Sequence, residues 1–200
     1  MTDQKTISAY DSQVDNYVEI IKQQPVDHTL LDFIARFEAD DYVLDLGCGP
    51  AMASATMREH GLRVDPTDAS KEMVKLANAT FDIGARQAQF SDISESDVYD
   101  GVWANFSLLH ASVEDFPNIL VALHKALKPK GLLHLGMKIG HGAVRDKYDR
   151  YYCYYSQDEL VEHLSKAGFV VENVELGEAL GMAGDMEPWI AVTSSAMLKT

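Results

Sequence analysis

The run from Tyr42 to Pro50, YVLDLGCGP, constrains the fold of this chain more than any other segment. Its first part, YVLDL, is strand-forming and apolar on both faces, as a central parallel strand requires. Gly47 and Gly49 lack a Cβ atom, so the backbone can turn sharply there and approach a ligand closely. A helix-forming segment follows and ends near Gly61. The run therefore predicts a strand, a glycine turn and a helix, the first half of a nucleotide-binding unit.

The acidic residue of this run, Asp45, comes before the glycines. A dinucleotide site would carry GxGxxG at this turn and would present the helix N-terminus to phosphates, and that spacing is absent. Asp68 follows roughly 20 residues after the glycines, the spacing expected of a carboxylate that binds ribose hydroxyls. The pattern indicates a nucleoside cofactor other than a dinucleotide.

Strand-like and helix-like segments alternate along the rest of the chain. Strands are predicted up to Leu46 and at 62–65, 86–90, 101–105 and 132–137, and helices at 8–21, 26–37, after Ser70, at 116–127 and at 157–167. Two last strands, near 169–176 and 189–194, have no helix between them and are expected to pair as a hairpin. The alternation predicts an α/β fold: a Rossmann-like doubly wound seven-stranded sheet, mostly parallel with one antiparallel strand.

The length and composition fit one domain over 1–200, with N-terminal helices forming a lid at 1–38 and a Rossmann-like core at 39–200. The formal net charge of −14 disfavours nucleic acid and anionic membranes as partners. The two cysteines, Cys48 and Cys153, show no metal-ligand spacing, so no metal is expected, and they suit a reducing cytoplasm. The polar N-terminus and the lack of a long apolar run predict neither a signal peptide nor a membrane span.

Five motifs in order resemble those of the class I methyltransferases that depend on S-adenosylmethionine (SAM). VLDLGCGP resembles motif I, RVDPTDASKEMVKLA the second strand with its acidic residue and helix, and FSDI the adenine-contacting motif. YDGVWANFSLLH and ALHKALKPKGLLHLGMK resemble the fourth strand and the following helix, turn and strand. The resemblance spans almost the whole chain. Its late segments are most similar to small, stand-alone bacterial enzymes of the tellurite-resistance-like type (methyltransferase-domain-25-like).

The resemblance implies the strand order 3-2-1-4-5-7-6, SAM as cofactor and S-adenosylhomocysteine as product. It also implies a set of cofactor-binding residues: Tyr10, Tyr17, Asp45, Gly47, Cys48, Gly49, Asp68, Ala69, Ser70, Met73, Asp92, Ile93, Asn105 and Phe106. Asp45 would face the methionine end of the cofactor, and Asp68 would accept hydrogen bonds from the ribose hydroxyls. Asp92 and Ile93 would contact adenine.

Several of these residues have a plainer interpretation. Asp45 can merely cap the following turn, and Asp65 rivals Asp68 at the end of the same strand. Met73 can be core, while Asp92 and Ile93 can be a surface acid and a core isoleucine. The tyrosines Tyr10 and Tyr17 lie seven residues apart on one helix face, where they either close over the cofactor or simply dock the helix.

The acceptor side of the site is less clear in the sequence. His110 is the candidate general base, because its unperturbed pKa lies near physiological pH, although it can equally be a structural residue at a helix start. The tyrosine-rich segment 140–156 is predicted to cap the acceptor pocket or to pack on the sheet edge. The candidate acceptor-binding residues are His110, Lys138, Arg150, Tyr151, Tyr154 and Trp189.

The predicted function is methyl transfer from SAM to a small-molecule nucleophile by in-line SN2 displacement, which mainly requires that donor and acceptor be aligned and water excluded. The alternatives are an RNA or protein methyltransferase, and a SAM-binding module without catalysis. A monomer or a homodimer is expected.

Overall fold

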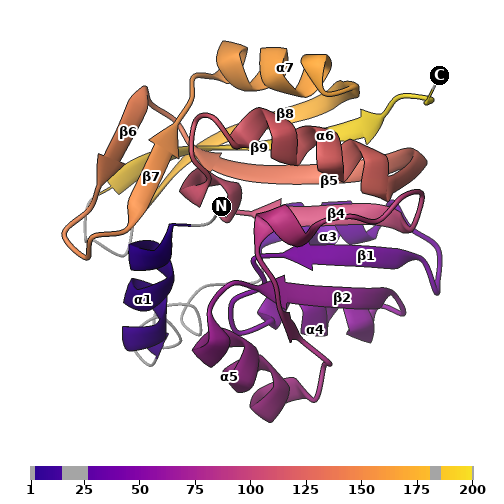
Figure 1. Cartoon of the computed structure of the whole chain (residues 1–200). Helices are drawn as coiled ribbons and strands as arrows, with labels where there is room; N and C mark the ends of the chain where they lie inside the picture. The colour runs from indigo at the N-terminus through magenta and orange to yellow at the C-terminus, as the bar shows by residue number, and fades with distance from the viewer. Residues whose placement is uncertain (1–2, 15–26, 181–185, 200) are drawn as a thin grey trace.

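The structure is a computed structural model that describes residues 3–14, 27–180 and 186–199. Seven strands form the central sheet in the order β3-β2-β1-β4-β5-β9-β8 (Figure 1). Strand β9 runs antiparallel to both of its neighbours, and the other pairs are parallel. The strands are β1 Tyr42–Leu46, β2 Arg63–Asp68, β3 Arg86–Gln87, β4 Tyr99–Asn105, β5 Leu127–Lys138, β8 Phe169–Leu180 and β9 Met186–Ala196. When the separate hairpin described below is left out of the count, this is the predicted order with its one antiparallel strand.

Helices cover both faces of the sheet (Figure 1). Helix α6 and helix α7 share one hydrophobic core with β4, β5 and β9. Helices α3 and α4 share a second core with β1 and β4 on the opposite face, and α5 packs beside α4. The described helices are α1 Gln4–Ser12, α3 His28–Ile34, α4 Met52–Glu59, α5 Lys71–Phe81, α6 Phe116–Ala126 and α7 Gln157–Lys166, with 3-10 turns at Phe90–Asp92 and Leu108–His110. The doubly wound architecture is therefore confirmed.

Local signals explain most of the helix ends. Ser70 caps α5 by accepting from the backbone N–H of Met73 at 3.1 Å. Ser156 and Glu159 form a reciprocal capping box at the start of α7. Because these signals depend only on neighbouring residues, the starts of α5 and α7 match the predicted ones.

Several predicted boundaries differ from the structure; β5, for example, begins at Leu127 instead of residue 132. Two of the differences have a local cause. The strand predicted at 86–90 is only two residues long, because Gln89 and Asp92 form a capping box that turns the chain into a 3-10 helix at Phe90. The helix predicted at 8–21 begins earlier, at Gln4, because Asp3 accepts from the backbone N–H of Thr6 at 2.9 Å and caps it. The later part of that predicted helix, with Tyr17, lies outside the described residues.

A two-stranded hairpin stands apart from the main sheet. Strand β6, Gly142–Arg145, pairs antiparallel with β7, Tyr151–Tyr154. The hairpin lies beside α1, at the end of the sheet where β1, β2 and β4 finish (Figure 1). This pairing gives the tyrosine-rich segment a defined shape that the sequence did not predict.

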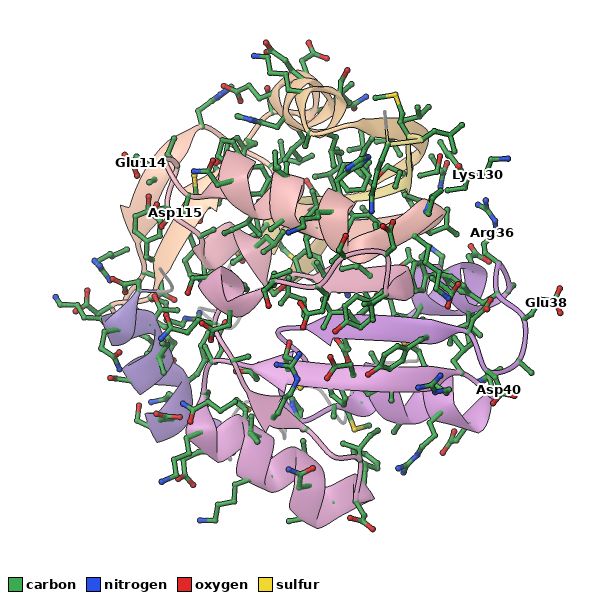
Figure 2. The ribbon with its side chains drawn as sticks, turned by 45° about the vertical axis from the view of Figure 1, so that its right-hand side comes forward. Arg36, Glu38, Asp40, Glu114, Asp115 and Lys130 are labelled. Carbon is green, nitrogen blue, oxygen red and sulfur yellow. The ribbon has the colours of Figure 1, made fainter. Side chains whose placement is uncertain are left out.

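Charged side chains cover the outer surface. Arg36, Glu38 and Asp40 lie in the connection before β1 and share one side of the molecule with Lys130, whereas Glu114 and Asp115 lie on the other side, before α6 (Figure 2). Among the described helices, none is both long and apolar enough to cross a membrane. The described residues also include no cluster of three or more histidine, cysteine or acidic side chains placed to hold a metal ion.

Candidate active site

A pocket opens where β1, β2 and β4 end, the place where ligands bind in doubly wound folds. Its empty volume, mouth included, is about 640 Å³. Ten predicted site residues line it: Tyr10, Gly47, Gly49, Asp68, Ala69, Ser70, Met73, Asn105, Phe106 and His110. Six further residues complete the lining: Thr6, Ile7, Leu46, Ala88, Phe90 and Ser107. The structure thus brings together most of the predicted cofactor residues around one space.

The glycine turn after β1 forms the floor of the pocket. The backbone N–H groups of Gly47 and Cys48 both donate to the carbonyl oxygen of Thr67, at 2.8 and 2.9 Å. Gly47 has a φ of +78°, in the region that favours glycine. A Cβ atom on Gly47 would lie 2.4 Å from the Cβ atom of Ser107. Glycine is therefore required here both by the backbone conformation and by the close approach of Ser107.

Asp68, at the end of β2, points into the pocket beside this turn. Its two carboxylate oxygens accept from the backbone N–H groups of Gly49 and Ser70, each at 2.8 Å. Burial raises the pKa of Asp68, and these two N–H donors oppose the rise. The rival Asp65 instead forms a bidentate pair with Arg86 at 2.8 and 2.9 Å and does not line the pocket. Of the two acids, Asp68 is the one placed to meet a ligand.

Asp45 is buried and does not line the pocket. The hydroxyl of Ser54 donates to its carboxylate at 2.5 Å, and burial raises the pKa of Asp45 to about 7. Cys48 is likewise buried, with its Sγ atom 3.6 Å from the carbonyl oxygen of Gly49, and burial raises the pKa of its thiol. Their direct contact with a cofactor stays a prediction, because the structure places both just behind the lining.

Asp92 and Ile93, the residues predicted to contact adenine, do not line the pocket, and their contact with adenine stays a prediction. Asp92 is exposed and accepts from the backbone N–H of Gln89 at 2.8 Å, while Ile93 packs against the main core. Ala88 and Phe90 line the pocket instead. The 3-10 turn accounts for this difference, since it rotates Phe90 inward where an extended strand was expected.

Asn105 and Phe106 end β4 at the pocket wall. The Nδ2 atom of Asn105 donates to Asp27 at 3.2 Å, and its Oδ1 atom lies 3.2 Å from Nε2 of His134. Phe106 has a φ of +54°, which is uncommon for a bulky side chain, and it is 38% exposed. Strained backbone of this kind gathers at functional sites.

His110 is buried and lines the pocket. Its Nδ1 atom is 2.6 Å from the carbonyl oxygen of Tyr151, and its Nε2 atom is 2.9 Å from the hydroxyl of Tyr10. A carbonyl oxygen only accepts, so Nδ1 carries the proton and Nε2 accepts from Tyr10. Burial lowers the pKa of His110 to about 4, aided by the cations Arg150 and Lys138, so the imidazole is neutral.

Arg150 extends this chain of hydrogen bonds. Its Nη1 atom donates to the Tyr10 oxygen at 3.3 Å, and its Nη2 atom pairs with Asp146 at 2.6 Å. Its guanidinium carbon also lies 5.2 Å from the centre of the Tyr152 ring. Arg150 therefore holds Tyr10 against His110 and does not line the pocket itself.

The remaining acceptor candidates do not line this pocket among the described residues. Lys138 forms an ion pair with Glu187, and Trp189 lies over Gly177. Tyr154 packs at the edge of the main core, and Tyr151 contributes its backbone. Their contact with an acceptor stays a prediction.

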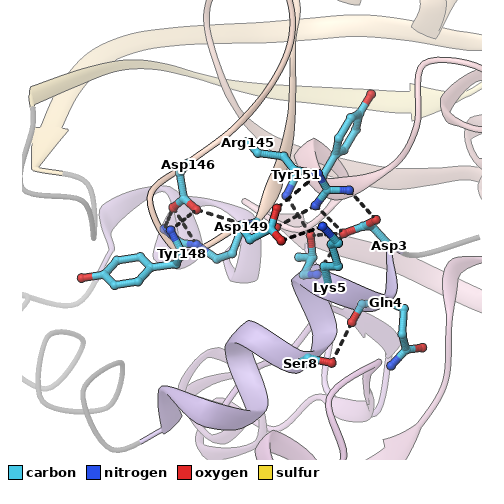
Figure 3. Close-up of polar contacts among 11 residues, drawn as sticks. Asp3, Gln4, Lys5, Ser8, Arg145, Asp146, Tyr148, Asp149 and Tyr151 are labelled. Carbon is cyan, nitrogen blue, oxygen red and sulfur yellow. Dashed lines mark hydrogen bonds and ion pairs between the residues drawn. The ribbon is translucent and has the colours of Figure 1, made fainter.

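The N-terminal end of helix α1 is fastened to the hairpin by polar contacts (Figure 3). Arg145 forms a bidentate pair with Asp3 at 2.8 and 2.9 Å, and Lys5 pairs with Asp149 at 2.8 Å. The backbone N–H of Tyr151 donates to the hydroxyl of Thr6 at 2.8 Å. These contacts place the pocket-lining face of α1.

A methyltransferase-domain family model matches residues 17–174, well over half of the chain. The chain belongs to this methyltransferase family. Together with the pocket, this makes it a class I methyltransferase with SAM as its cofactor. The family match does not distinguish subtypes, so the tellurite-resistance-like type stays a prediction. No curated protein sequence matches the methyltransferase significantly.

Solved structures share its fold. The 1,6-didemethyltoxoflavin-N1-methyltransferase of Burkholderia thailandensis, with bound 1,6-didemethyltoxoflavin and S-adenosylhomocysteine, is 20% identical, with a TM-score of 0.78 over 97% of this chain and 88% of that chain. A SAM-dependent methyltransferase of Methanosarcina mazei is 18% identical, with a TM-score of 0.73 over 88% of this chain and 99% of that one. A chain in the complex of the Haloferax volcanii Trm112 activator with a methyltransferase is 19% identical, with a TM-score of 0.78 over 98% and 99%.

The sequence analysis missed six lining residues of the methyltransferase. Thr6 and Ile7 lie four and three positions before Tyr10, so the helical period offered a signal for them. Ser107 belongs to the WANFSLLH segment, and its position in the pocket follows from its contact with Gly47, which the sequence does not show. Leu46 read as a buried strand residue, and Ala88 and Phe90 depend on the 3-10 turn.

Proposed function

We propose that the methyltransferase binds SAM in the pocket at the ends of β1, β2 and β4 and transfers its methyl group to a small-molecule nucleophile. The observation that carries this proposal is the pairing of the glycine floor with the Asp68 carboxylate in one pocket. The bound group supplies an electrophilic methyl on a sulfonium sulfur. The net charge of −14 supports a small acceptor over a nucleic acid.

The residues fit such a cofactor. Gly47 and Gly49 line the pocket without side chains, so a ligand can approach the main chain closely there. Asp68 accepts from two backbone N–H groups, one on each carboxylate oxygen. Each oxygen has a second lone pair, so the carboxylate can also accept from two ribose hydroxyls. Ala69, Ser70 and Met73 would wall the adenosine part, while Tyr10, Asn105 and Phe106 would lie toward the methionine part.

His110 is proposed to take a proton from an acceptor that carries one. Its Nε2 lone pair accepts from Tyr10 in this structure, so the acceptor must displace the Tyr10 hydroxyl to reach it. Since the pKa of His110 is near 4, the imidazole is unprotonated at neutral pH but is a weak base. This suits acceptors that lose a proton readily, such as thiols, over aliphatic amines.

Calorimetric titration with SAM, S-adenosylhomocysteine and NAD tests the cofactor site. Both adenosyl ligands should bind and NAD should not. Asp68→Asn should weaken binding about tenfold or more, because charge-assisted hydrogen bonds are lost. Asp65→Asn is the matched control on the same strand and should change affinity by less than about twofold. No binding by the unaltered protein, or equal losses in the two variants, would overturn this assignment.

A screen of small acceptors that measures formation of S-adenosylhomocysteine tests the reaction. Turnover with a thiol or another acidic nucleophile supports the proposed function. Saturable SAM binding without turnover of any acceptor favours the non-catalytic binding module. Tight, salt-sensitive binding of RNA, with methyl incorporation into it, favours the RNA methyltransferase alternative.

A further inference from the structure

A second polar network reaches the pocket from the α3 face of the sheet. His134 on β5 and Trp103 on β4 are paired across the two strands, and their rings stack with centroids 3.7 Å apart and planes 15° from parallel. His134 is 1% exposed. Its Nε2 atom lies 3.2 Å from Oδ1 of Asn105, which lines the pocket. The stack fixes the plane of the imidazole, and the hydrogen bond ties that plane to the pocket wall.

The direction of every hydrogen bond in this network follows from Asp27. Its Oδ1 atom accepts from the backbone N–H and the hydroxyl of Thr29, at 2.9 and 2.7 Å, and so caps α3. Its Oδ2 atom lies 3.2 Å from the amide of Asn105. A carboxylate only accepts, so the NH₂ group of Asn105 must face Asp27 and its oxygen must face His134. His134 therefore carries its proton on Nε2.

Gly136 makes room for this arrangement. It is the β5 partner of Asn105, and a Cβ atom on it would lie 2.0 Å from Oδ1 of Asn105. Because Gly136 has no side chain, it leaves a hollow in the strand surface that the amide oxygen occupies. The oxygen is directed into this hollow and toward His134, and the NH₂ group is left at the pocket edge.

We infer that His134 is a positioning residue for the cofactor pocket: by donating from Nε2 to the Asn105 oxygen, it holds the Asn105 NH₂ group ready to donate to the cofactor. One N–H of that group is used by Asp27, and the second is available to a bound carboxylate or carbonyl oxygen. The inference rests on the proposed function only in that the cofactor reaches Asn105.

A matched pair of variants tests it. His134→Phe keeps an aromatic ring beside Trp103 and removes the donor, whereas His134→Gln restores an N–H at about the place of Nε2. We expect S-adenosylhomocysteine to bind about three- to tenfold more weakly to the Phe variant and within about twofold of the unaltered protein to the Gln variant. Equal affinity in the Phe variant, or equal losses in both variants, would overturn the inference.

Thermal unfolding of each variant separates positioning from folding. A purely structural role would lower the melting temperature of the Phe variant and would leave the affinity of its folded fraction unchanged, which contradicts the inference. A loss of affinity at an unchanged melting temperature supports it. Failure of the unaltered protein to bind S-adenosylhomocysteine would count against the proposed function instead, so the two failures are distinguishable.

A spectroscopic measurement on the unaltered protein needs no variant. Long-range ¹H–¹⁵N correlation of the histidine rings should show His134 as a neutral imidazole protonated on Nε2, at pH 6 to 8 alike. The Asn105 side-chain NH₂ signals should shift when S-adenosylhomocysteine is added. Protonation of His134 on Nδ1 would overturn the inference, as would Asn105 signals that do not respond to a ligand that binds.

Discussion

The side chain of Asp11, on helix α1, accepts a hydrogen bond of 2.5 Å from the hydroxyl of Ser70, the residue that caps α5. The same carboxylate oxygen lies 3.3 Å from the backbone N–H of Glu72 in the first turn of α5. A negative charge at a helix N-terminus is favourable, so Asp11 docks α1 where the helix dipole attracts it. Because Ser70 also lines the pocket, this contact joins the N-terminal helix to the cofactor wall.

Replacement of Asp11 should loosen α1 and weaken cofactor binding together. In Asp11→Ala, we expect faster amide hydrogen exchange over residues 4–12 and about three- to tenfold weaker binding of S-adenosylhomocysteine. Ser12→Ala is the control, since Ser12 is exposed and its hydroxyl donates to the carbonyl oxygen of Ala9 in the same helix. If exchange over α1 is unchanged in the Asp11 variant, the docking role of this contact is wrong.

Replacement of Gly47 by alanine should destabilise the fold, because the added Cβ atom would collide with Ser107 and the backbone there has a positive φ. Gly84 supplies the control for backbone conformation, because it has a similar φ of +73° and no atom within 4 Å of its notional Cβ. Gly84→Ala should cost about 1 kcal/mol in unfolding free energy, and Gly47→Ala about 1 to 3 kcal/mol more. Urea denaturation measures both. Ser107→Gly should recover part of the extra loss in the double variant, and strict additivity would argue against the clash.

The stability of the protein should depend on the ionisation of Asp45. Its folded pKa of about 7 lies above the value of 3.8 for an unperturbed aspartate, so the folded state binds more protons between these values. Stability from this group is therefore present at low pH and lost as pH rises from about 4 to about 7. Asp45→Asn should remove this slope, which is at most about 1.4 kcal/mol per pH unit. Urea unfolding of both proteins from pH 5 to pH 8 should show the variant gaining stability relative to the unaltered protein as the pH rises. A difference in unfolding free energy that does not change with pH would disprove the raised pKa.

The ion pairs between α1 and the hairpin should be sensitive to salt. Arg145→Gln removes the bidentate pair with Asp3, and we expect a loss of less than about 1 kcal/mol in stability but faster hydrogen exchange in the hairpin. The difference should shrink in 1 M salt, because exposed charges are screened. Lys5→Gln, which removes a single exposed pair, is the comparison and should change exchange less. An effect of Arg145→Gln that does not depend on salt would point to packing instead.

Short-range patterns predicted much of the fold and many of the residues that line the pocket. The apolar run ending at Leu46, the glycine turn and the cap at Ser70 each depend on residues a few positions apart, and they place Gly47, Gly49 and Asp68 correctly around one pocket. The choice of Asp68 over Asp65 followed from its place just past the predicted strand at 62–65. In the structure, Asp65 is instead paired with Arg86.

Contacts between distant segments were beyond this kind of prediction. Tyr10 meets His110 across 100 positions, and Thr6 meets Tyr151 across 145. No periodicity in the sequence encodes such a distance, so the hydrogen-bond partner of His110 and the shape of the hairpin could be seen only in the structure. The same holds for the contacts of His134 with Asn105 and Trp103, which lie on another strand.

The connection between Tyr151 and its two partners has a consequence for redesign. The backbone N–H of residue 151 donates to Thr6 on α1, and its backbone carbonyl oxygen accepts from His110. Both contacts are therefore independent of the side chain at this position. A mutational library at this position can therefore vary size, charge and polarity beside His110 while the histidine keeps its tautomer. Position 151 is therefore a site at which variants with new acceptor preferences can be sought while the backbone contacts to α1 and His110 are kept.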